Sequence, residues 1–279
     1  MKKIILLGKD SGLGKQLRAN LEKKTNLICI GRKDFDILVD FNKLERLIKI
    51  EKPKYIINCI AITKFVDAEN DPKLSYDINS IFPLKLANIA KLVNAFLIHF
   101  SSEAVFSGLN KKLPNEDAPP NPLTVYGKSK WLAEVGLLSL NNNLIIRLPT
   151  LIGPTHNKQI VYKIISRIKK KKIVYVSKQI ISTPLYTPLF AEFFYRNIIC
   201  SKKIIKRKLI NVTSQRQLSS FQIIKIISKS INITKKIIPV NENFFGHKFF
   251  KPKNLGLTSK YKDCILDFNI DSNYIKNIK

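Results

Sequence analysis

The sequence has no long apolar run. Across its 279 residues, no uninterrupted hydrophobic stretch approaches the roughly 18 residues that a membrane-spanning helix needs. The basic start "MKK" leads into a short apolar segment without a small-residue cleavage site, unlike a secretory signal peptide. We therefore expect no membrane span, a cytoplasmic protein, and a first β-strand at residues 3–7.

Cysteine is also sparse, and its spacing is irregular. The four cysteines, Cys29, Cys59, Cys200 and Cys264, form no CxxC motif and no paired metal-ligand spacing, which argues against a zinc site. We expect them to be small core residues in a reducing compartment, and we expect no bound metal.

Acidic residues are few compared with basic ones. Lys and Arg number 49 and Asp and Glu number 20, which gives a net charge of +29, and such an excess suits nucleic acid or an anionic membrane. The basic runs at residues 169–172 and 202–208, however, contain no aromatic residues on which bases could stack. We expect a solvated, lysine-rich surface and no specific nucleic-acid site, with a basic nucleic-acid-binding protein as the alternative.

What the sequence does contain is a regular alternation of two patterns. Short apolar runs predict strands at residues 3–7, 27–30, 55–61, 96–101 and 144–148. Apolar residues spaced three and four apart predict helices at residues 12–24, 42–50, 78–93 and 129–140. The alternation predicts an α/β fold, a Rossmann-type doubly wound parallel sheet, whose ligands lie outside the carboxyl ends of the strands.

The pattern becomes looser after Pro149. We expect a basic helix at residues 160–172, a short strand at 173–176, a strand that ends at 211–212 and a helix at 219–231. We therefore predict a Rossmann domain over residues 1–150 and a smaller substrate-binding lobe over residues 151–279, with some segments of the lobe packing back on the Rossmann domain.

A glycine-rich stretch, "GKDSGLGKQ", follows the first predicted strand. It is not a P-loop, because five residues separate Gly8 from Gly14 and Gln16 follows Lys15, whereas a P-loop has one residue fewer there and Ser or Thr after the lysine. Glycines between a strand and a helix also form the turn that holds a dinucleotide pyrophosphate against a helix N-terminus. The stretch predicts such a site, with an ordinary strand-to-helix turn as the alternative.

A second stretch, "VYGKSK", places Tyr126 and Lys130 four residues apart at the start of a helix, so both side chains share one face. A lysine ammonium beside a phenol lowers the pKa of the phenol, which makes Tyr126 a usable proton donor or acceptor. Upstream, "HFSSEAVFSG" places Ser101 and Ser102 at the carboxyl end of a predicted strand. Each feature alone is common in helices and turns.

Together, the glycine turn, the serine after a later strand and Tyr-x-x-x-Lys resemble the short-chain dehydrogenase/reductase superfamily. The similarity is closer to its extended branch, and within that branch to the dTDP-4-dehydrorhamnose reductases and related sugar-nucleotide reductases. The supporting segments, in the order of that family, are "NCIAIT" with Asp67 and Glu69 behind it, Asn79 in "DINSIFPLKLA", "SSEAVFSG", "VYGKSK", Arg147 in "IIRLP", and "KPKNLGL".

The resemblance implies reduction of the 4-keto group of a nucleotide-diphosphate deoxysugar by NADPH, for cell-surface polysaccharide synthesis. It implies that Tyr126 is the catalytic acid/base, that Lys130 lowers the pKa of Tyr126 and binds the nicotinamide ribose, and that Ser102 holds the substrate carbonyl. The other cofactor-binding residues that it implies are Gly8, Ser11, Gly12, Leu13, Gly14, Arg32, Asp40, Phe41, Ala61 and Thr63.

Arg32 bears on the choice of cofactor. It follows the second predicted strand, where NAD-binding folds place a carboxylate and NADP-binding folds place a cation. We therefore expect NADPH, with NADH as the alternative cofactor and a solvated arginine as the structural alternative. The glycine spacing, GxxxGxG, is that of the classical branch of the superfamily, and either spacing binds a dinucleotide.

The expected sugar pocket departs from the rhamnose enzymes. Glu103 replaces their Asp, Ala104 stands where they tend to carry Tyr, and Thr150 where they tend to carry Trp. The substrate-binding residues implied are Ser102, Glu103, Ala104 and Thr150. Loss of two aromatic walls predicts an open pocket and a poor fit for dTDP-4-dehydrorhamnose, unless Phe65 or Tyr186 fills the gap.

Two other functions stay open. A regulatory subunit of methionine adenosyltransferase resembles these reductases, so the chain could be a non-catalytic NADP-binding module, although the set Ser102, Tyr126 and Lys130 favours an enzyme. A sugar-nucleotide epimerase or dehydratase is the second alternative, but dehydratases of this branch carry a consecutive acidic pair where Glu103 is followed by Ala104. A nucleotide sugar is the expected partner, and a homodimer is left open.

Overall fold

The computed structural model describes residues 1–109, 112–154, 166, 168, 173–201, 203–230, 236–246, 250 and 252–267. Its centre is a parallel sheet of six strands in the order β10-β5-β4-β3-β1-β2. The strands are β1 (Lys3–Leu7), β2 (Asn26–Ile30), β3 (Tyr55–Asn58), β4 (Phe96–Ser102), β5 (Asn143–Leu148) and β10 (Leu209–Asn211). The strand order reverses direction beside β1, as a doubly wound sheet does, so the predicted Rossmann-type fold is confirmed.

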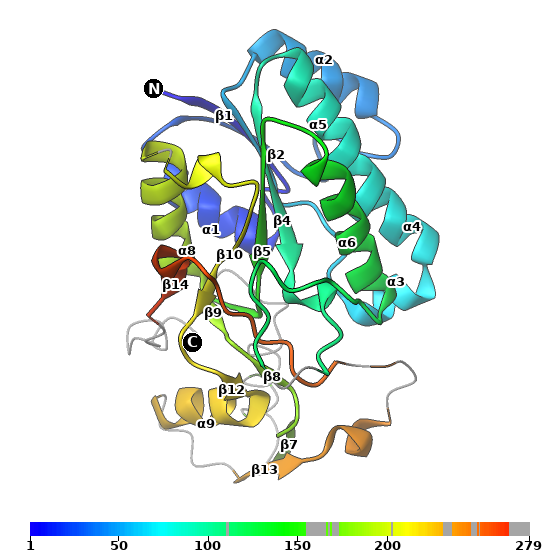
Figure 1. The fold of residues 1–279 in the computed structure, drawn as a ribbon, viewed down its shortest axis with the longest axis vertical. Coiled ribbons are helices and arrows are strands. Elements are labelled where there is room, and N and C mark those ends of the chain that lie inside the picture. The colour runs from blue at the N-terminus through cyan, green and yellow to red at the C-terminus, as the bar shows by residue number, and fades with distance from the viewer. Residues whose placement is uncertain are drawn as a thin grey trace.

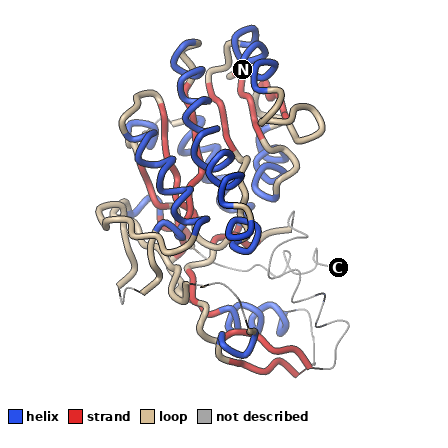
Figure 2. Tube along the Cα trace, turned by 90° about the vertical axis from the view of Figure 1, so that its right-hand side faces the viewer, coloured by secondary structure: helices blue, strands red, loops and turns tan. Residues whose placement is uncertain are grey.

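Helices cover both faces of the sheet (Figures 1 and 2). On one face lie α1 (Gly12–Leu21) and α8 (Thr187–Phe193), and on the other lie α2 (Phe41–Glu51), α5 (Phe82–Leu92) and α6 (Val125–Leu138). Two short helices, α3 (Phe65–Asn70) and α4 (Pro72–Tyr76), precede α5, and the helical segment η1 (Asp77–Ile81) joins α4 to α5. Figure 2, turned from Figure 1, shows the sheet between these two helical layers.

The core lies on both sides of the sheet because successive side chains of a strand point to opposite faces. In β1, Ile4 and Leu6 belong to the apolar cluster with α1 and α8, whereas Ile5 and Leu7 belong to the cluster with α2 and α5. A strand buried on both faces needs apolar residues at every position. This explains why the strands show up in the sequence as continuous apolar runs.

A smaller lobe lies beyond the carboxyl ends of the sheet strands (Figure 1). It has its own apolar cluster, built on α9 (Ser220–Ser230) and β7 (Ile173–Ser177), and β7 pairs with β13 (Lys236–Val240). The other short strands are β6 (Leu151–Ile152), β8 (Ile181–Ser182), β9 (Leu185–Tyr186), β11 (Thr213–Ser214), β12 (Leu218–Ser219) and β14 (Ile265–Leu266). The remaining short helical segments are η2 (Glu103–Val105), η3 (Phe194–Cys200), η4 (Ile204–Lys206), η5 (Glu242–Phe245) and η6 (Lys262–Cys264).

Residues after 150 also return to the main sheet, since β10 pairs with β5 and α8 packs on α1. The predicted division at residue 150 stays a prediction.

Most predicted element boundaries differ from the structure by a few residues, and two of these differences have a visible cause. Strand β3 ends at Asn58 rather than at residue 61, because the Asn58 side-chain oxygen accepts a hydrogen bond from the Ile60 N–H at 3.0 Å and turns the chain. Helix α6 begins at Val125 rather than at residue 129, because the Thr124 hydroxyl accepts from the Gly127 N–H at 3.1 Å and caps it. The basic helix predicted at 160–172 lies outside the described residues, apart from 166 and 168.

The cysteines do not all lie in the core. Cys264 is buried, but Cys200 is exposed, so the expectation of core positions is wrong for Cys200. Within the described ranges, no helix has the length and hydropathy to cross a membrane. The same part of the chain holds no cluster of three or more His, Cys, Asp or Glu side chains that could bind a metal ion.

Candidate active site

The glycine turn joins β1 to α1 and leaves no room for side chains. Gly8 has a φ of +80°, a conformation that favours glycine. A Cβ at Gly14 would lie 2.0 Å from the Gly8 carbonyl oxygen, so only glycine lets the turn close this tightly. Ser11 caps α1 by accepting from the Gly14 N–H at 3.0 Å. The turn therefore presents the start of α1 at the strand edge, which fits a pyrophosphate.

The neighbouring cofactor candidates differ in exposure. The Leu13 side chain is buried in the core beneath α1, so only its backbone faces the turn. Arg32 is exposed just after β2. Beside it, Asp34 accepts from the Gly31 N–H at 2.7 Å and pairs with Lys9, and the hydrogen bond from Lys9 lowers the pKa of Asp34.

Asp40 and Phe41 lie at the start of α2. Asp40 forms an ion pair with Lys43 at 2.7 Å, and this contact lowers the pKa of Asp40. Phe41 packs edge-on against Phe82, with ring centroids 6.2 Å apart. The structure thus gives Phe41 a packing role between α2 and α5, and its predicted contact with adenine stays a prediction.

Ala61 and Thr63 lie in the loop after β3, not on the strand itself as the sequence predicts. Asn79 holds this loop: its side-chain oxygen accepts from the Ile62 N–H at 2.9 Å, and its amide nitrogen donates to the Ile62 carbonyl at 3.0 Å. The same nitrogen lies 3.0 Å from the Ser129 hydroxyl on α6. Buried Asn79 therefore joins the loop to the helix that carries Tyr126.

Ser102 and Tyr126 meet at the carboxyl end of β4. The Ser102 oxygen accepts from the Ala104 N–H at 3.2 Å. Burial raises the pKa of Tyr126 to about 12, although the polar interaction with the Ser102 hydroxyl acts in the opposite direction. The phenol therefore keeps its proton at neutral pH, and its pKa is not lowered as the Tyr126–Lys130 spacing predicts.

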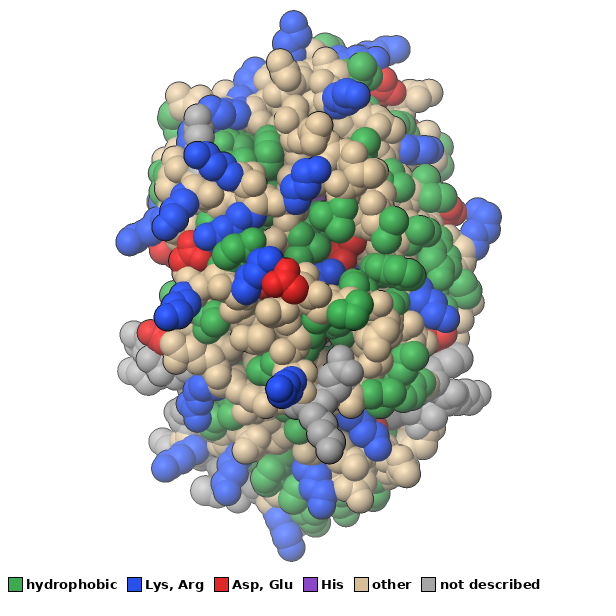
Figure 3. Space-filling model, in the orientation of Figure 1, with side chains coloured by type: hydrophobic (Ala, Val, Ile, Leu, Met, Phe, Trp, Pro, Cys, Tyr) green, Lys and Arg blue, Asp and Glu red, His purple; other side chains and the backbone are tan. Residues whose placement is uncertain are grey.

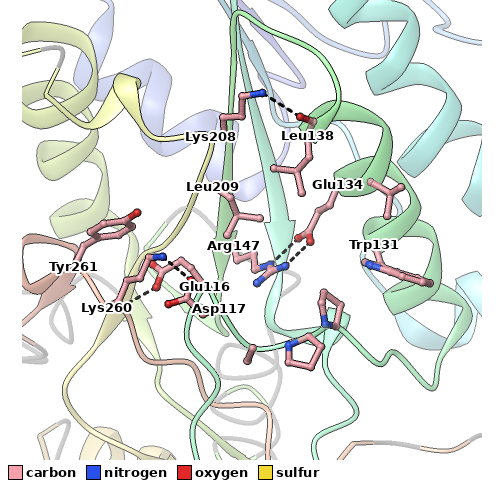
Figure 4. A pocket seen from close by; sticks show the side chains of 14 residues that line it. Glu116, Asp117, Trp131, Glu134, Leu138, Arg147, Lys208, Leu209, Lys260 and Tyr261 are labelled. Carbon is pink, nitrogen blue, oxygen red and sulfur yellow. Dashed lines mark hydrogen bonds and ion pairs between the residues drawn. The ribbon is translucent and has the colours of Figure 1, made fainter.

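One buried stripe of α6 carries Tyr126, Lys130 and Glu134 at successive four-residue steps. Burial lowers the pKa of Lys130 to about 8, while the charge of Glu134 acts against this change. Glu134 forms a buried ion pair with Arg147 of β5, with a closest contact of 2.7 Å. Glu134, Arg147 and the exposed Trp131 also border the surface pocket in Figure 4, which contains none of the predicted catalytic residues.

Glu103 links the sheet to the smaller lobe. Its carboxyl accepts from the Thr150 hydroxyl at 3.0 Å and from the Ser182 hydroxyl at 2.9 Å. Burial raises the pKa of Glu103 to about 8, against the effect of these hydrogen bonds. Two of the predicted substrate residues, Glu103 and Thr150, therefore contact each other next to Ser102.

Ala104 is buried. It is 1% exposed and clusters with Tyr126, and Phe65 packs against this cluster. The Phe65 ring meets the Tyr126 ring edge-on at 5.4 Å. Tyr186 packs against the core of the smaller lobe instead. This packing agrees with the alternative in which Phe65 rebuilds the apolar wall, and the open pocket stays a prediction.

Sequence reasoning did not identify three buried polar residues of this site. Asn58, His99 and Asn79 are each at most 1% exposed. Asn58 and His99 interrupt the apolar runs "YIIN" and "FLIHF", and a polar residue inside a buried strand must find a partner. That interruption is the signal that could have identified them.

A Rossmann-type sheet with a serine, a tyrosine and a lysine gathered at one strand end defines the short-chain dehydrogenase/reductase class. Within it, the chain belongs to the RmlD substrate binding domain family, whose model matches residues 1–271.

The relatives of this chain include both a reductase and a subunit of another enzyme. The chain is 30% identical to dTDP-4-dehydrorhamnose reductase of Streptomyces griseus over 152 residues, which are 53% of this chain and 50% of that protein. It is 37% identical to methionine adenosyltransferase 2 subunit beta of Bos taurus over 119 residues, which are 42% of this chain and 35% of that protein. These matches thus span half or less of each relative.

A solved structure resembles the whole chain. The dTDP-4-dehydrorhamnose reductase of Bacillus anthracis, in complex with NADP, superposes with a TM-score of 0.89 at 25% identity, covering 100% of this chain and 99% of that one.

Proposed function

We propose that this protein is an NADPH-dependent reductase that acts on the 4-keto group of a nucleotide-diphosphate deoxysugar. The observation that carries the proposal is the burial of Ser102, Tyr126 and Lys130 together, with Ser102 at the carboxyl end of β4 and the other two on one face of α6. Membership of the RmlD substrate binding domain family and the likeness to an NADP-bound reductase support the same activity.

The cofactor contacts follow from the turn geometry. Gly8, Ser11, Gly12, Leu13 and Gly14 would form the turn against which the pyrophosphate lies at the start of α1. The N–H groups of Gly8, Ser11 and Gly14 donate within the protein and hold the shape of this turn. Further contacts would come from Arg32 to the 2′-phosphate, from Lys130 and Tyr126 near the ribose, and from Asp40, Phe41, Ala61 and Thr63. Bound NADPH supplies the hydride for the carbonyl carbon.

The chain's own residues handle the proton. Tyr126 holds its proton at neutral pH because burial raises its pKa, so the phenol is in the state that reduction requires. It donates this proton to the substrate oxygen as negative charge develops there. The Ser102 hydroxyl donates a hydrogen bond to the same oxygen and stabilises that charge.

The first candidate substrate is dTDP-4-dehydrorhamnose. Phe65 restores apolar surface beside Ala104, so one of the two reasons to expect a poor fit is removed. Glu103 and Thr150 would contact the sugar, since they lie beside Ser102 and bond to each other. We assign the product to cell-surface polysaccharide synthesis and the enzyme to the cytoplasm, and a homodimer is the oligomer to test.

A non-catalytic module is the second candidate function. It is favoured by the 37% identity to methionine adenosyltransferase 2 subunit beta over 119 residues. A module would bind NADPH without consuming it. An epimerase is less favoured, because the likeness to UDP-glucose 4-epimerase of Thermotoga maritima, at 15% identity, extends to the fold alone.

A substrate panel tests the proposal. The purified protein should oxidise NADPH when dTDP-4-dehydrorhamnose is added, and the fall in NADPH absorbance measures the rate. The rate should be lower with UDP- and GDP-linked 4-keto sugars. Binding of NADPH without turnover on any member of the panel would instead support the module.

A further inference from the structure

Three buried polar side chains form a row behind the candidate active site. Asn58 ends β3 and lies directly opposite His99 of β4 in the strand register. The Asn58 amide nitrogen lies 3.2 Å from His99 Nδ1, and His99 Nε2 lies 3.2 Å from the Lys130 amino group. His99 is completely buried and Lys130 is 2% exposed, so each side chain depends on its neighbours for hydrogen bonds.

The hydrogen bonds assign the tautomer of His99. The Asn58 side-chain oxygen accepts from the Ile60 N–H at 3.0 Å, so the Asn58 amide turns its N–H toward His99 Nδ1. Nδ1 must then be the acceptor, and a neutral imidazole carries its hydrogen on Nε2. That N–H faces Lys130, and only an uncharged amine has the lone pair to accept from it.

We propose that His99, oriented by Asn58, is a positioning residue that holds Lys130 through an Nε2–H donor and thereby favours the uncharged form of this lysine. The catalytic part of this inference rests on the proposed reductase function. Lys130 would consequently gain and lose its proton close to neutral pH, unlike an ordinary lysine.

The electrostatic surroundings agree with the geometry. Burial holds the pKa of His99 well below its usual range, so the imidazole is neutral. Burial also lowers the pKa of Lys130 to about 8.

The charged groups nearby are few. Glu134 favours the ammonium form of Lys130, but Glu134 is paired with Arg147 of β5. Burial raises the pKa of the Cys59 thiol, which is therefore uncharged. Tyr126 on α6 and Glu103 of η2 are the other titratable groups, and burial raises the pKa of each.

The tautomer is measurable without any substrate. Long-range ¹H–¹⁵N spectra of the full chain, labelled with ¹⁵N-histidine, distinguish an unprotonated ring nitrogen from a protonated one. The chain has three histidines, so the signals of His99 are those lost in His99→Gln. Should that variant not fold, His156→Gln and His247→Gln remove the other two sets and identify His99 by elimination.

We expect an unprotonated Nδ1 and a protonated Nε2 from pH 6 to pH 9, with no titration near the ordinary histidine pKa. A protonated Nδ1, or a ring that titrates like a free histidine, would overturn the assignment.

Asn58→Asp tests the consequence for Lys130. One carboxylate oxygen can still accept from Ile60, while the other would accept from Nδ1–H and turn the Nε2 lone pair toward Lys130. In this variant we expect the reversed tautomer. We also expect the alkaline limb of the pH profile of kcat/KM to move up by about one pH unit or more, the size of shift that a nearby opposite charge produces.

The double variant separates the tautomer from the added charge. Asn58→Asp is introduced into the parent protein and into His99→Gln, and the two shifts of the pH profile are compared. Equal shifts would mean that the added charge alone acts, and would refute the role of His99. A smaller shift in His99→Gln supports that role. The ¹H–¹⁵N spectra determine the tautomer of His99 even if the protein reduces no substrate. A protein with the expected tautomer and no activity would therefore contradict the proposed function and leave the hydrogen-bond assignment standing.

Discussion

At the scale of single residues, burial decides most of the chemistry. Tyr126, Lys130 and Glu103 are each less than 10% exposed, and burial shifts the pKa of each toward its uncharged form. Helical spacing in the sequence correctly places Tyr126 and Lys130 on one face. It could not show that burial raises the pKa of Tyr126, because burial depends on residues distant in sequence, such as Phe65.

Arg32 is predicted to set the cofactor preference. Arg32→Ala should reduce the preference for NADPH over NADH by about 10- to 100-fold, because a charged hydrogen bond to the 2′-phosphate contributes roughly 1.5–3 kcal/mol. Fluorescence titration with both cofactors measures it. Lys33→Ala, at the neighbouring exposed cation, is the matched control, and an unchanged preference in Arg32→Ala contradicts the assignment.

Glu103 is predicted to make the folded state less stable as pH rises. Its pKa is raised from 4.5 to about 8 in the folded protein, so between these values the folded state holds a proton that the unfolded state has lost. The contribution of Glu103 is thus greatest at low pH and declines as pH rises toward 8.

Urea unfolding at pH 5.5 and pH 8.5 measures this contribution. Glu103→Gln keeps one oxygen that accepts from Thr150 or Ser182, places an NH2 group that donates to the other hydroxyl, and removes the titration. The variant should therefore lose less stability than the parent protein between the two pH values. Equal losses in both proteins would show that Glu103 does not carry the raised pKa.

At the scale of elements, periodicity predicted the five N-terminal sheet strands and the longer helices between them, with boundary errors of a few residues, but it missed the short helices α3 and α4. The errors at β3 and α6 come from side-chain caps, Asn58 and Thr124, which a hydrophobic pattern does not record. The short strand pairs of the smaller lobe were mostly missed, because two-residue strands are too short to show a period.

Asn79 is predicted to stabilise the contact between the loop after β3 and α6. Asn79→Ala removes one buried and two partly buried hydrogen bonds and leaves the Ile62 backbone groups without these partners. The free energy of unfolding should therefore fall by about 1–3 kcal/mol. Chemical denaturation measures the change. The control is Asn70→Ala at the exposed end of α3, and a loss no larger than in this control refutes the role.

At the scale of the whole molecule, the basic residues are scattered. On the face shown in Figure 3, Lys and Arg side chains are spread from end to end and are not gathered over one element. The net charge of +29 therefore affects the general field around the protein more than any single site. Sequence composition could give this charge but not its distribution.

We accordingly predict only non-specific binding to DNA. Affinity should be the same for unrelated duplexes and should fall steeply between about 50 and 200 mM salt, because binding is driven by release of counterions. Fluorescence anisotropy with two unrelated sequences measures this. Tight binding to one sequence at physiological salt would instead indicate a specific nucleic-acid site.

The central claim, that the chain is a reductase with Tyr126 as its proton donor, is tested most directly by turnover of Tyr126→Phe with NADPH and dTDP-4-dehydrorhamnose. We predict that the variant binds NADPH like the parent protein but loses about 10²–10⁴-fold in kcat, the range for a general acid. A variant that binds the cofactor and keeps the turnover of the parent protein would contradict the account.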